Sequence, residues 1–427
     1  MFVSGKAISE MPDKKMYCFI YTLLNISGIV YIMRNLIGPI VTGEDYFPDE
    51  RTHQRVRTEI EKGVNVNMPG PRRTGKSSFV KNFCEDMKVA GWHTVYCDVQ
   101  GADTPLQFCQ KVVDSVQAEG FIPAGKARFR QLLDAARKIK KVKLLDFIEI
   151  EGEGQSGSLT DLLEELVKEC NSLDKKVILA IDEMTLFLVY LLRENNGDLR
   201  EADKFLATLR RLRSQYTNVK WIFLGSIGLF QFARKHGLSS HLNDLSPQMI
   251  PPLDRDRAKD MLQKLAKGAG STVIESEDYF LDRLGAPTYF DVQLLFSEVM
   301  NQNNGTPITK KAIDQAFLQL VEGNGKSRFA TWHERLDDYL EPEEVGDTLA
   351  ILAHLSLVDS ATMDELLNPL MARIPNRNLK ETESILKSLV DGLAEDGYIT
   401  GISDDSSNRR YAFRSLLLKE CWKRWWS

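Results

Sequence analysis

The residues best suited to chemistry form the segment Gly70–Ser77, GPRRTGKS, which fits the pattern G-x-x-x-x-G-K-[ST] at every fixed position. Its glycines let the backbone approach a ligand closely, and successive N–H groups at a helix start form a cradle for an anion. We expect Lys76 to reach the β- and γ-phosphates of a nucleotide, and the Ser77 hydroxyl to ligate Mg²⁺. The expected phosphate-binding residues are Gly70, Pro71, Arg72, Arg73, Thr74, Gly75, Lys76, Ser77 and Ser78.

Two adjacent carboxylates, Asp182 and Glu183, form a second candidate site. They follow the uninterrupted apolar run Val177–Ile181, which predicts a strand buried on both faces of a parallel sheet. Ligands of open α/β sheets bind at the carboxyl ends of the strands. We expect Asp182 to share the metal with Ser77, and Glu183 to orient or deprotonate the water that attacks the γ-phosphate. A carboxylate in that role indicates a hydrolase rather than a small-molecule kinase.

Four other side chains have both a functional and an ordinary interpretation. Ser226 follows the apolar run Val219–Leu224 and could touch the γ-phosphate or the water, or simply end a strand. Phe47 could cover an adenine ring or belong to the core. Arg210 and Arg211 could reach the γ-phosphate of a neighbouring subunit as an arginine finger. The better interpretation of this pair is that the two cations are stabilised by the C-terminus of their own helix.

Apolar runs separated by helical patterns predict a parallel α/β sheet with crossover helices. The expected strands are Val64–Met68, Thr94–Asp98, Val177–Ile181, Val219–Leu224 and a segment around Gln248–Ile250. From residue 253 the patterns are helical, which predicts a lid over the nucleotide. The expected lid helices are Arg255–Gly268, Ser276–Leu284, Phe290–Asn301 and Lys310–Glu322.

Residues 341–427 show three helical patterns, a β-hairpin and a terminal amphipathic helix, which is winged-helix order. This unit carries more acidic than basic residues, so a protein contact is favoured over DNA. The predicted organisation is a hydrophobic N-terminal segment over residues 1–33, an ATPase core over 34–252, a helical lid over 253–340 and a winged-helix domain over 341–427.

The composition is that of a globular protein, with 43% hydrophobic and 27% charged residues in 427. The net charge of −5 provides no overall attraction for nucleic acid. The six cysteines form no C-x-x-C pair, which argues against a zinc site or a disulfide framework and fits a reducing cytoplasm. No nuclease, protease or deaminase pattern is present, so an effector is expected on a separate chain.

Two segments keep alternative interpretations. Tyr17–Ile32 is uncharged and largely apolar, so it could be a membrane anchor, a buried or amphipathic element, or a stretch upstream of a true start at Met33. Lys126–Lys143 is rich in Lys and Arg and could be a solvated helix face, a DNA-binding surface or a contact for an acidic partner.

Taken together, these motifs resemble those of the AAA-type ATPases of the STAND kind (signal-transduction ATPases with numerous domains), in particular the archaeal-type ATPases with a C-terminal winged helix. The resemblance covers roughly residues 40–427. Besides the two motifs above, it rests on Gly225-Ser226, on the lid residues Gly285 and Pro287, and on the terminal sequence YAFRSLLLKECWKRWW. It implies a P-loop NTPase (ASCE/AAA-type) fold, ATP and Mg²⁺ as cofactors, and Lys76, Glu183 and Ser226 as catalytic residues.

The favoured function is an ATP-binding and hydrolysing switch whose nucleotide state controls the lid, the winged helix and a protein partner, with ATP-dependent self-assembly as an option. One alternative is a DNA-acting AAA ATPase, a loader or transposition regulator, that uses Lys126–Lys143. The other is a scaffold that holds nucleotide without turnover.

Overall fold

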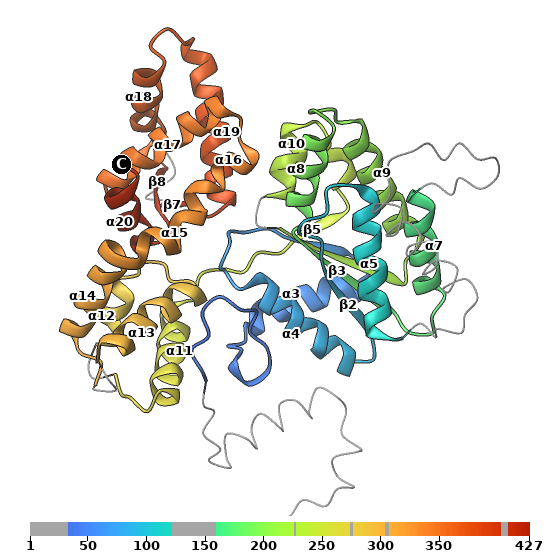
Figure 1. Ribbon diagram of the computed structural model, residues 1–427, viewed down its shortest axis with the longest axis horizontal. Helices are drawn as coiled ribbons and strands as arrows, with labels where there is room; N and C mark the ends of the chain where they lie inside the picture. The colour runs from blue at the N-terminus through green and yellow to red at the C-terminus, as the bar shows by residue number, and fades with distance from the viewer. Residues whose placement is uncertain (1–32, 122–158, 226–227, 274–275, 304–306, 403–408) are drawn as a thin grey trace, which may run out of the picture.

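The computed structural model describes residues 33–121, 159–225, 228–273, 276–303, 307–402 and 409–427 (Figure 1). An α/β part with a central sheet and a part built mostly of helices lie side by side, and the chain crosses between them near the middle of the molecule. None of the described helices has the length and apolar character needed to cross a membrane. The segments Tyr17–Ile32 and Lys126–Lys143 lie outside the described residues.

The sheet is parallel throughout, as the sequence predicts, with the strand order β2-β3-β4-β1-β5. Its strands are β1 (Asn65–Met68), β2 (His93–Asp98), β3 (Val177–Asp182), β4 (Val219–Leu224) and β5 (Leu245–Pro247). The fifth prediction, Gln248–Ile250, was wrong by three residues. Leu245 lies beside Asn65 at the start of this pairing, and Pro247, which has no N–H, is the last strand residue.

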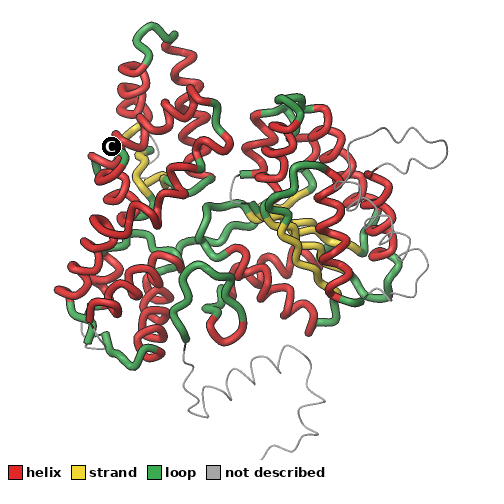
Figure 2. Tube along the Cα trace, in the orientation of Figure 1, coloured by secondary structure: helices red, strands yellow, loops and turns green. Residues whose placement is uncertain are grey.

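Helices cover both faces of the sheet (Figure 2). One face packs on α3 (Glu50–Glu61) and α4 (Lys76–Val89) through buried residues such as Val66, Ile178 and Ile222. The opposite face of the sheet packs against its own helices through Leu179, Trp221 and their neighbours. The helices on this face are α5 (Pro105–Glu119), α7 (Leu159–Asn171), α8 (Met184–Glu194), α9 (Arg200–Gln215) and α10 (Leu229–Lys235).

The second part of the chain folds around one continuous hydrophobic core that includes residues from Leu253 to Trp422. Its first helices are α11 (Arg255–Gly268), α12 (Glu277–Asp282), α13 (Tyr289–Asn303), α14 (Lys310–Gln319), α15 (Gly325–Glu334) and α16 (Leu336–Tyr339). The predicted helix Lys310–Glu322 ends as an α-helix at Gln319 and continues as the π-helical turn Leu320–Asn324.

Residues beyond 341 form the predicted helices, hairpin and terminal helix in the predicted order, with one short strand, β6, that the sequence did not predict. They are α17 (Pro342–Leu357), β6 (Ala361–Thr362), α18 (Met363–Arg373), α19 (Leu379–Glu395), β7 (Ile399–Ile402), β8 (Arg410–Phe413) and α20 (Leu416–Trp425). The three strands form a separate antiparallel sheet in the order β6-β8-β7. The assignment of this unit as a winged-helix domain stays a prediction.

Candidate functional site

The predicted phosphate loop lies between β1 and α4, at the carboxyl edge of the parallel sheet. Gly70 and Gly75 have φ angles of 138° and 88°, a region that side chains with a Cβ rarely enter. Gly75 is the residue that precedes α4, so the first N–H groups of this helix face the loop. The glycine spacing therefore has a direct structural reason.

Lys76 is buried within its own loop. The Lys76 residue is only 7% exposed, and its Nζ donates to the carbonyl oxygens of Gly70 and Pro71 at 2.6 Å each. Burial lowers the pKa of the Lys76 ammonium to about 8. Thr74 donates its hydroxyl to the same Pro71 carbonyl at 2.9 Å. Two carbonyls thus hold the cation that the sequence assigns to the phosphates.

The predicted metal ligands lie together at the end of β3. Ser77 Oγ donates to Asp182 Oδ2 at 2.6 Å, and the Glu183 N–H donates to Asp182 Oδ1 at 2.9 Å. A hydroxyl and a carboxylate are the oxygen donors that Mg²⁺ prefers, so the donor set fits this ion. Glu183 has a φ of 58° and connects β3 to α8 in a left-handed conformation. This φ value is uncommon for a non-glycine residue and has no sequence signal.

A fourth residue of this group was not predicted. The Tyr96 hydroxyl, from β2, also donates to Asp182 Oδ2. Burial and the charge of Asp182 raise the pKa of the Tyr96 phenol.

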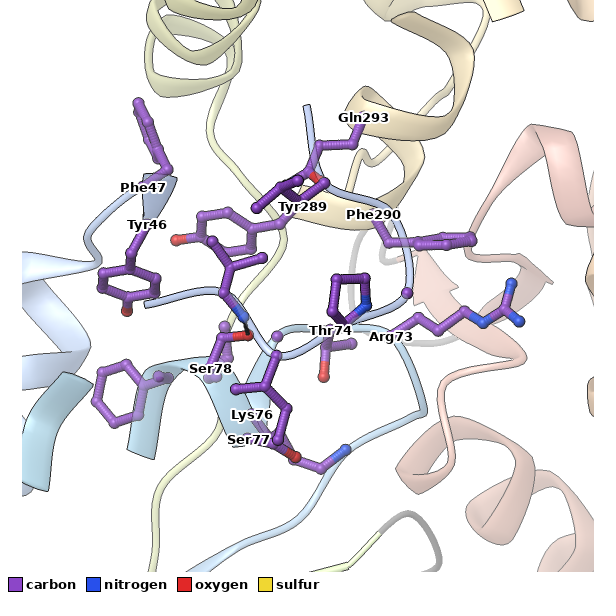
Figure 3. Close-up of a pocket in the computed structure, with 18 of the residues that line it drawn as sticks. Tyr46, Phe47, Arg73, Thr74, Lys76, Ser77, Ser78, Tyr289, Phe290 and Gln293 are labelled. Atoms are coloured by element: carbon purple, nitrogen blue, oxygen red, sulfur yellow. Dashed lines mark hydrogen bonds between the residues drawn. The ribbon is translucent and has the colours of Figure 1, made fainter. Parts of the chain in front are cut away.

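A cavity of about 290 Å³ lies beside the loop and contains both carboxylates in its wall. The wall opposite the loop comes from the segment that precedes α3, from the start of α13 and from Ile250 (Figure 3). Phe47 lines the cavity and is also a core residue, 6% exposed, with its ring centroid 6.2 Å from that of Tyr289. Both interpretations of Phe47 thus have a structural basis, and its contact with a base stays a prediction.

The segment before α3 is tied directly to the loop helix. The Val41 N–H donates to Ser78 Oγ at 2.9 Å, and Asn82 Nδ2 donates to the Val41 carbonyl at 2.9 Å. Asn82 Oδ1 accepts from the Gly43 N–H at 3.1 Å. These bonds fix the cavity wall relative to α4. Val41 and Asn82 carried no recognisable signal in the sequence, because their partners are distant in the chain.

The arginine-finger candidates lie elsewhere. They belong to the C-terminal half of α9, which leads into the start of β4 at the sheet edge opposite the loop. Arg211 donates to both carboxylate oxygens of Glu164 at 2.9 and 2.8 Å, and Arg210 donates to the Ser240 carbonyl. This placement favours the local interpretation. Ser226, the remaining catalytic candidate, lies outside the described residues.

The turn after α19 covers the phosphate loop, a contact that no local pattern in the sequence indicates. Gly397 has a φ of 74°, and a Cβ placed there would lie 2.3 Å from Pro71 Cγ. Asp396 is 1% exposed and accepts a hydrogen bond from the Gly228 N–H at 3.0 Å. Glu395 pairs with Arg234 of α10 at 3.3 Å. The turn therefore touches both the loop and the segment that follows β4.

A second contact joins the loop to the helical part. Arg73 Nη1 donates to the Arg328 carbonyl at 2.8 Å, and its guanidinium lies 4.6 Å from the centroid of Phe290. Lys235 of α10 pairs with Glu344 of α17 at 2.7 Å. The phosphate loop is thus held between the nucleotide cavity and the C-terminal half of the chain.

Residues 68–232 match the family model described as the AAA domain. The chain contains a P-loop AAA-type ATPase domain. Its matched region includes the loop, both carboxylates and the start of α10. Over 91% of its length the chain has a fold similar to the Walker-type ATPase PABY2304 of Pyrococcus abyssi, with a TM-score of 0.59, 15% identity and 99% of that chain covered.

Two further solved structures have lower TM-scores. Cdc6p of Pyrobaculum aerophilum has a TM-score of 0.42 and 14% identity, covering 90% of this chain and 99% of its own. The ADP form of the Aeropyrum pernix ORC2 protein has a TM-score of 0.44 and 13% identity, covering 90% and 93%. No curated protein sequence matches the chain.

Proposed function

We propose that the chain binds ATP with Mg²⁺, hydrolyses it, and uses the nucleotide state to control the docking of its C-terminal half on the phosphate loop. One observation carries this proposal. Pro71 belongs to the loop expected to hold the phosphates, its carbonyl holds Lys76, and its ring packs against Gly397. A change at the phosphates therefore acts on the C-terminal contact through a single residue.

Binding begins with charge. The loop amides and the start of α4 face the triphosphate, and Lys76 exchanges its two carbonyl partners for phosphate oxygens. The aromatic and apolar wall formed by Val41, Phe47, Ile250 and Tyr289 suits the face of a purine. These side chains would hold the purine base of the nucleotide.

Ser77 and Asp182 would hold Mg²⁺, which neutralises charge on the β- and γ-phosphates. The Glu183 carboxylate, in the wall of the same cavity, then orients the attacking water and accepts its proton. The left-handed conformation of Glu183 places it immediately before α8, so its backbone is fixed by both elements.

Release of the loop carbonyls alters the surface that Gly397 contacts. Because Gly397 already leaves no room for a methyl group against Pro71, a small displacement of the loop changes the docking free energy of the turn. Asp396 of this turn and Glu395, the last residue of α19, contact Gly228 and Arg234, so movement of the turn also reaches the segment after β4. A protein partner or a second copy of the chain would bind the surface that this movement exposes.

The test combines nucleotide binding, phosphate release and hydrogen exchange on the wild-type chain and two variants. We expect Lys76→Ala to lose nucleotide binding and Glu183→Gln to keep ATP bound without turnover. We also expect faster amide exchange of residues 395–398 with ATP than with ADP. Wild-type turnover in Lys76→Ala would refute the proposed site, and identical exchange with both nucleotides would refute the coupling.

A further inference from the structure

The Asp182 carboxylate, assigned to the metal, accepts hydrogen bonds from a helix hydroxyl, a strand phenol and the N–H of the next residue. Asp182 Oδ2 accepts from Ser77 Oγ of α4 and from the Tyr96 hydroxyl of β2, and Oδ1 accepts from the Glu183 N–H. Each carboxylate oxygen has two lone pairs, so Oδ2 can accept both hydroxyls at once. Together these bonds fix the rotation of the Asp182 side chain.

Tyr96 is itself held in place from the loop helix. In the register of β2 and β3, Tyr96 lies opposite Ala180, two residues before the level of Asp182, a distance that its long side chain bridges. The Lys81 ammonium lies 4.7 Å from the Tyr96 ring centroid. Lys81 is four residues after Ser77, so both side chains lie on the same face of α4. The phenol is therefore positioned by the helix that also carries the metal hydroxyl.

A phenol hydroxyl has a single proton, and that of Tyr96 is directed at Asp182 Oδ2. With the Ser77 proton directed at Oδ2, the lone pairs of the Ser77 hydroxyl remain available for a cation.

We propose that Tyr96 is a positioning residue for the metal site, orienting the Asp182 carboxylate that holds Mg²⁺ with Ser77. This inference rests on the proposed function, because it assumes that these oxygens hold the metal of a nucleotide complex. Tyr96 acts through Asp182 and has no assigned contact with the phosphates. Loss of such an outer hydrogen-bond partner costs about 10- to 100-fold in metal affinity in characterised sites.

The test measures metal binding directly, with Mn²⁺ as the probe. The dissociation constant of Mn²⁺ is determined by electron paramagnetic resonance on the full chain with a saturating non-hydrolysable ATP analogue. We expect Tyr96→Phe to weaken Mn²⁺ binding by about tenfold. Nucleotide affinity in EDTA should match the wild type, because the phosphate loop is unchanged.

Tyr216→Phe is a matched control, since the Tyr216 hydroxyl, at the end of α9, donates to the Glu164 carboxylate of α7 at 3.2 Å. It should bind Mn²⁺ like the wild type. Tyr96→Leu removes the hydroxyl with a different side chain and must show the same loss as Tyr96→Phe. Thermal unfolding of each variant shows whether it is folded under the conditions of the titration.

The outcomes separate the two proposals. If the wild type binds neither the analogue nor Mn²⁺, the proposed function fails and Tyr96 has no metal site to serve. If the wild type binds both and Tyr96→Phe binds Mn²⁺ equally well, only the role of Tyr96 is refuted. An equal loss in Tyr216→Phe would also refute it, because the effect would then not depend on Asp182.

Discussion

Replacement of Gly397 by alanine tests the contact between the phosphate loop and the C-terminal half of the chain. The new Cβ would lie 2.3 Å from Pro71 Cγ and 2.8 Å from both Pro71 Cβ and Cδ. The Pro71 ring is rigid and cannot rotate away, so either the turn or the loop must move. We expect the turn to separate from the loop, because the loop is fixed at both ends by β1 and α4.

Two costs contribute to this change. Alanine in a left-handed conformation costs roughly 1–2 kcal/mol. Overpacking against Pro71 costs about 1–3 kcal/mol more. Only the second cost is specific to docking, and it corresponds to roughly 5- to 150-fold in the docking equilibrium at 1.4 kcal/mol per factor of ten.

The matched control is Gly101→Ala. Gly101 has a φ of 79°, close to the 74° of Gly397, and no atom lies within 4 Å of the position of its added Cβ. It therefore carries the conformational cost without the clash. Hydrogen exchange of the amides near Pro71 and Gly397, followed by mass spectrometry, measures docking in both variants.

We expect faster exchange at both segments in Gly397→Ala and wild-type exchange there in Gly101→Ala. Adding Pro71→Ala to Gly397→Ala should restore part of the protection, since it removes the ring that the new methyl group meets. Unchanged exchange in Gly397→Ala would show that the packing is loose, and the coupling argument would fail.

Three further predictions concern the same region. Burial lowers the pKa of the Lys76 ammonium to about 8, whereas bound phosphates would keep it charged. Nucleotide affinity should therefore be nearly constant below pH 8 and fall up to about tenfold per pH unit above it. Fluorescence titration measures this affinity, and Lys76→Arg should remove the decline. Glu183→Gln should lower phosphate release by about 10²- to 10⁴-fold with ATP still bound after gel filtration, and rapid turnover would reject Glu183 as the base. Asp396→Ala leaves the Gly228 N–H without its acceptor at a cost of about 1–3 kcal/mol, so exchange of that amide should accelerate, and wild-type protection would contradict the docked turn.

The elements that the sequence predicted well are those whose signals are local. The phosphate loop occupies consecutive residues, Gly70–Ser77, and β3 is apolar along its whole buried length up to Asp182. Such features need no knowledge of distant partners, so the sheet and the adjacent carboxylates can be predicted from the amino-acid sequence alone.

The missed elements depend on tertiary context. The helix α8 follows the carboxylates directly and is apolar on nearly every side, so it has no amphipathic pattern. Tyr96 is one aromatic residue in a strand, and only the pairing of β2 with β3 brings it to Asp182. Gly397 belongs to no motif in the sequence, and only its packing on Pro71 makes it informative.

The contacts over the phosphate loop can form only late in the synthesis of the chain. Arg73 and Arg328 are 255 positions apart, and Gly228 and Asp396 are 168 positions apart. Translation proceeds at about 5–20 residues per second, so the sheet leaves the ribosome several seconds or more before the turn that covers its loop. During that interval the nascent AAA domain has no C-terminal cover over its loop. Under the proposed function, any nucleotide that it binds then would be in place before the rest of the chain folds.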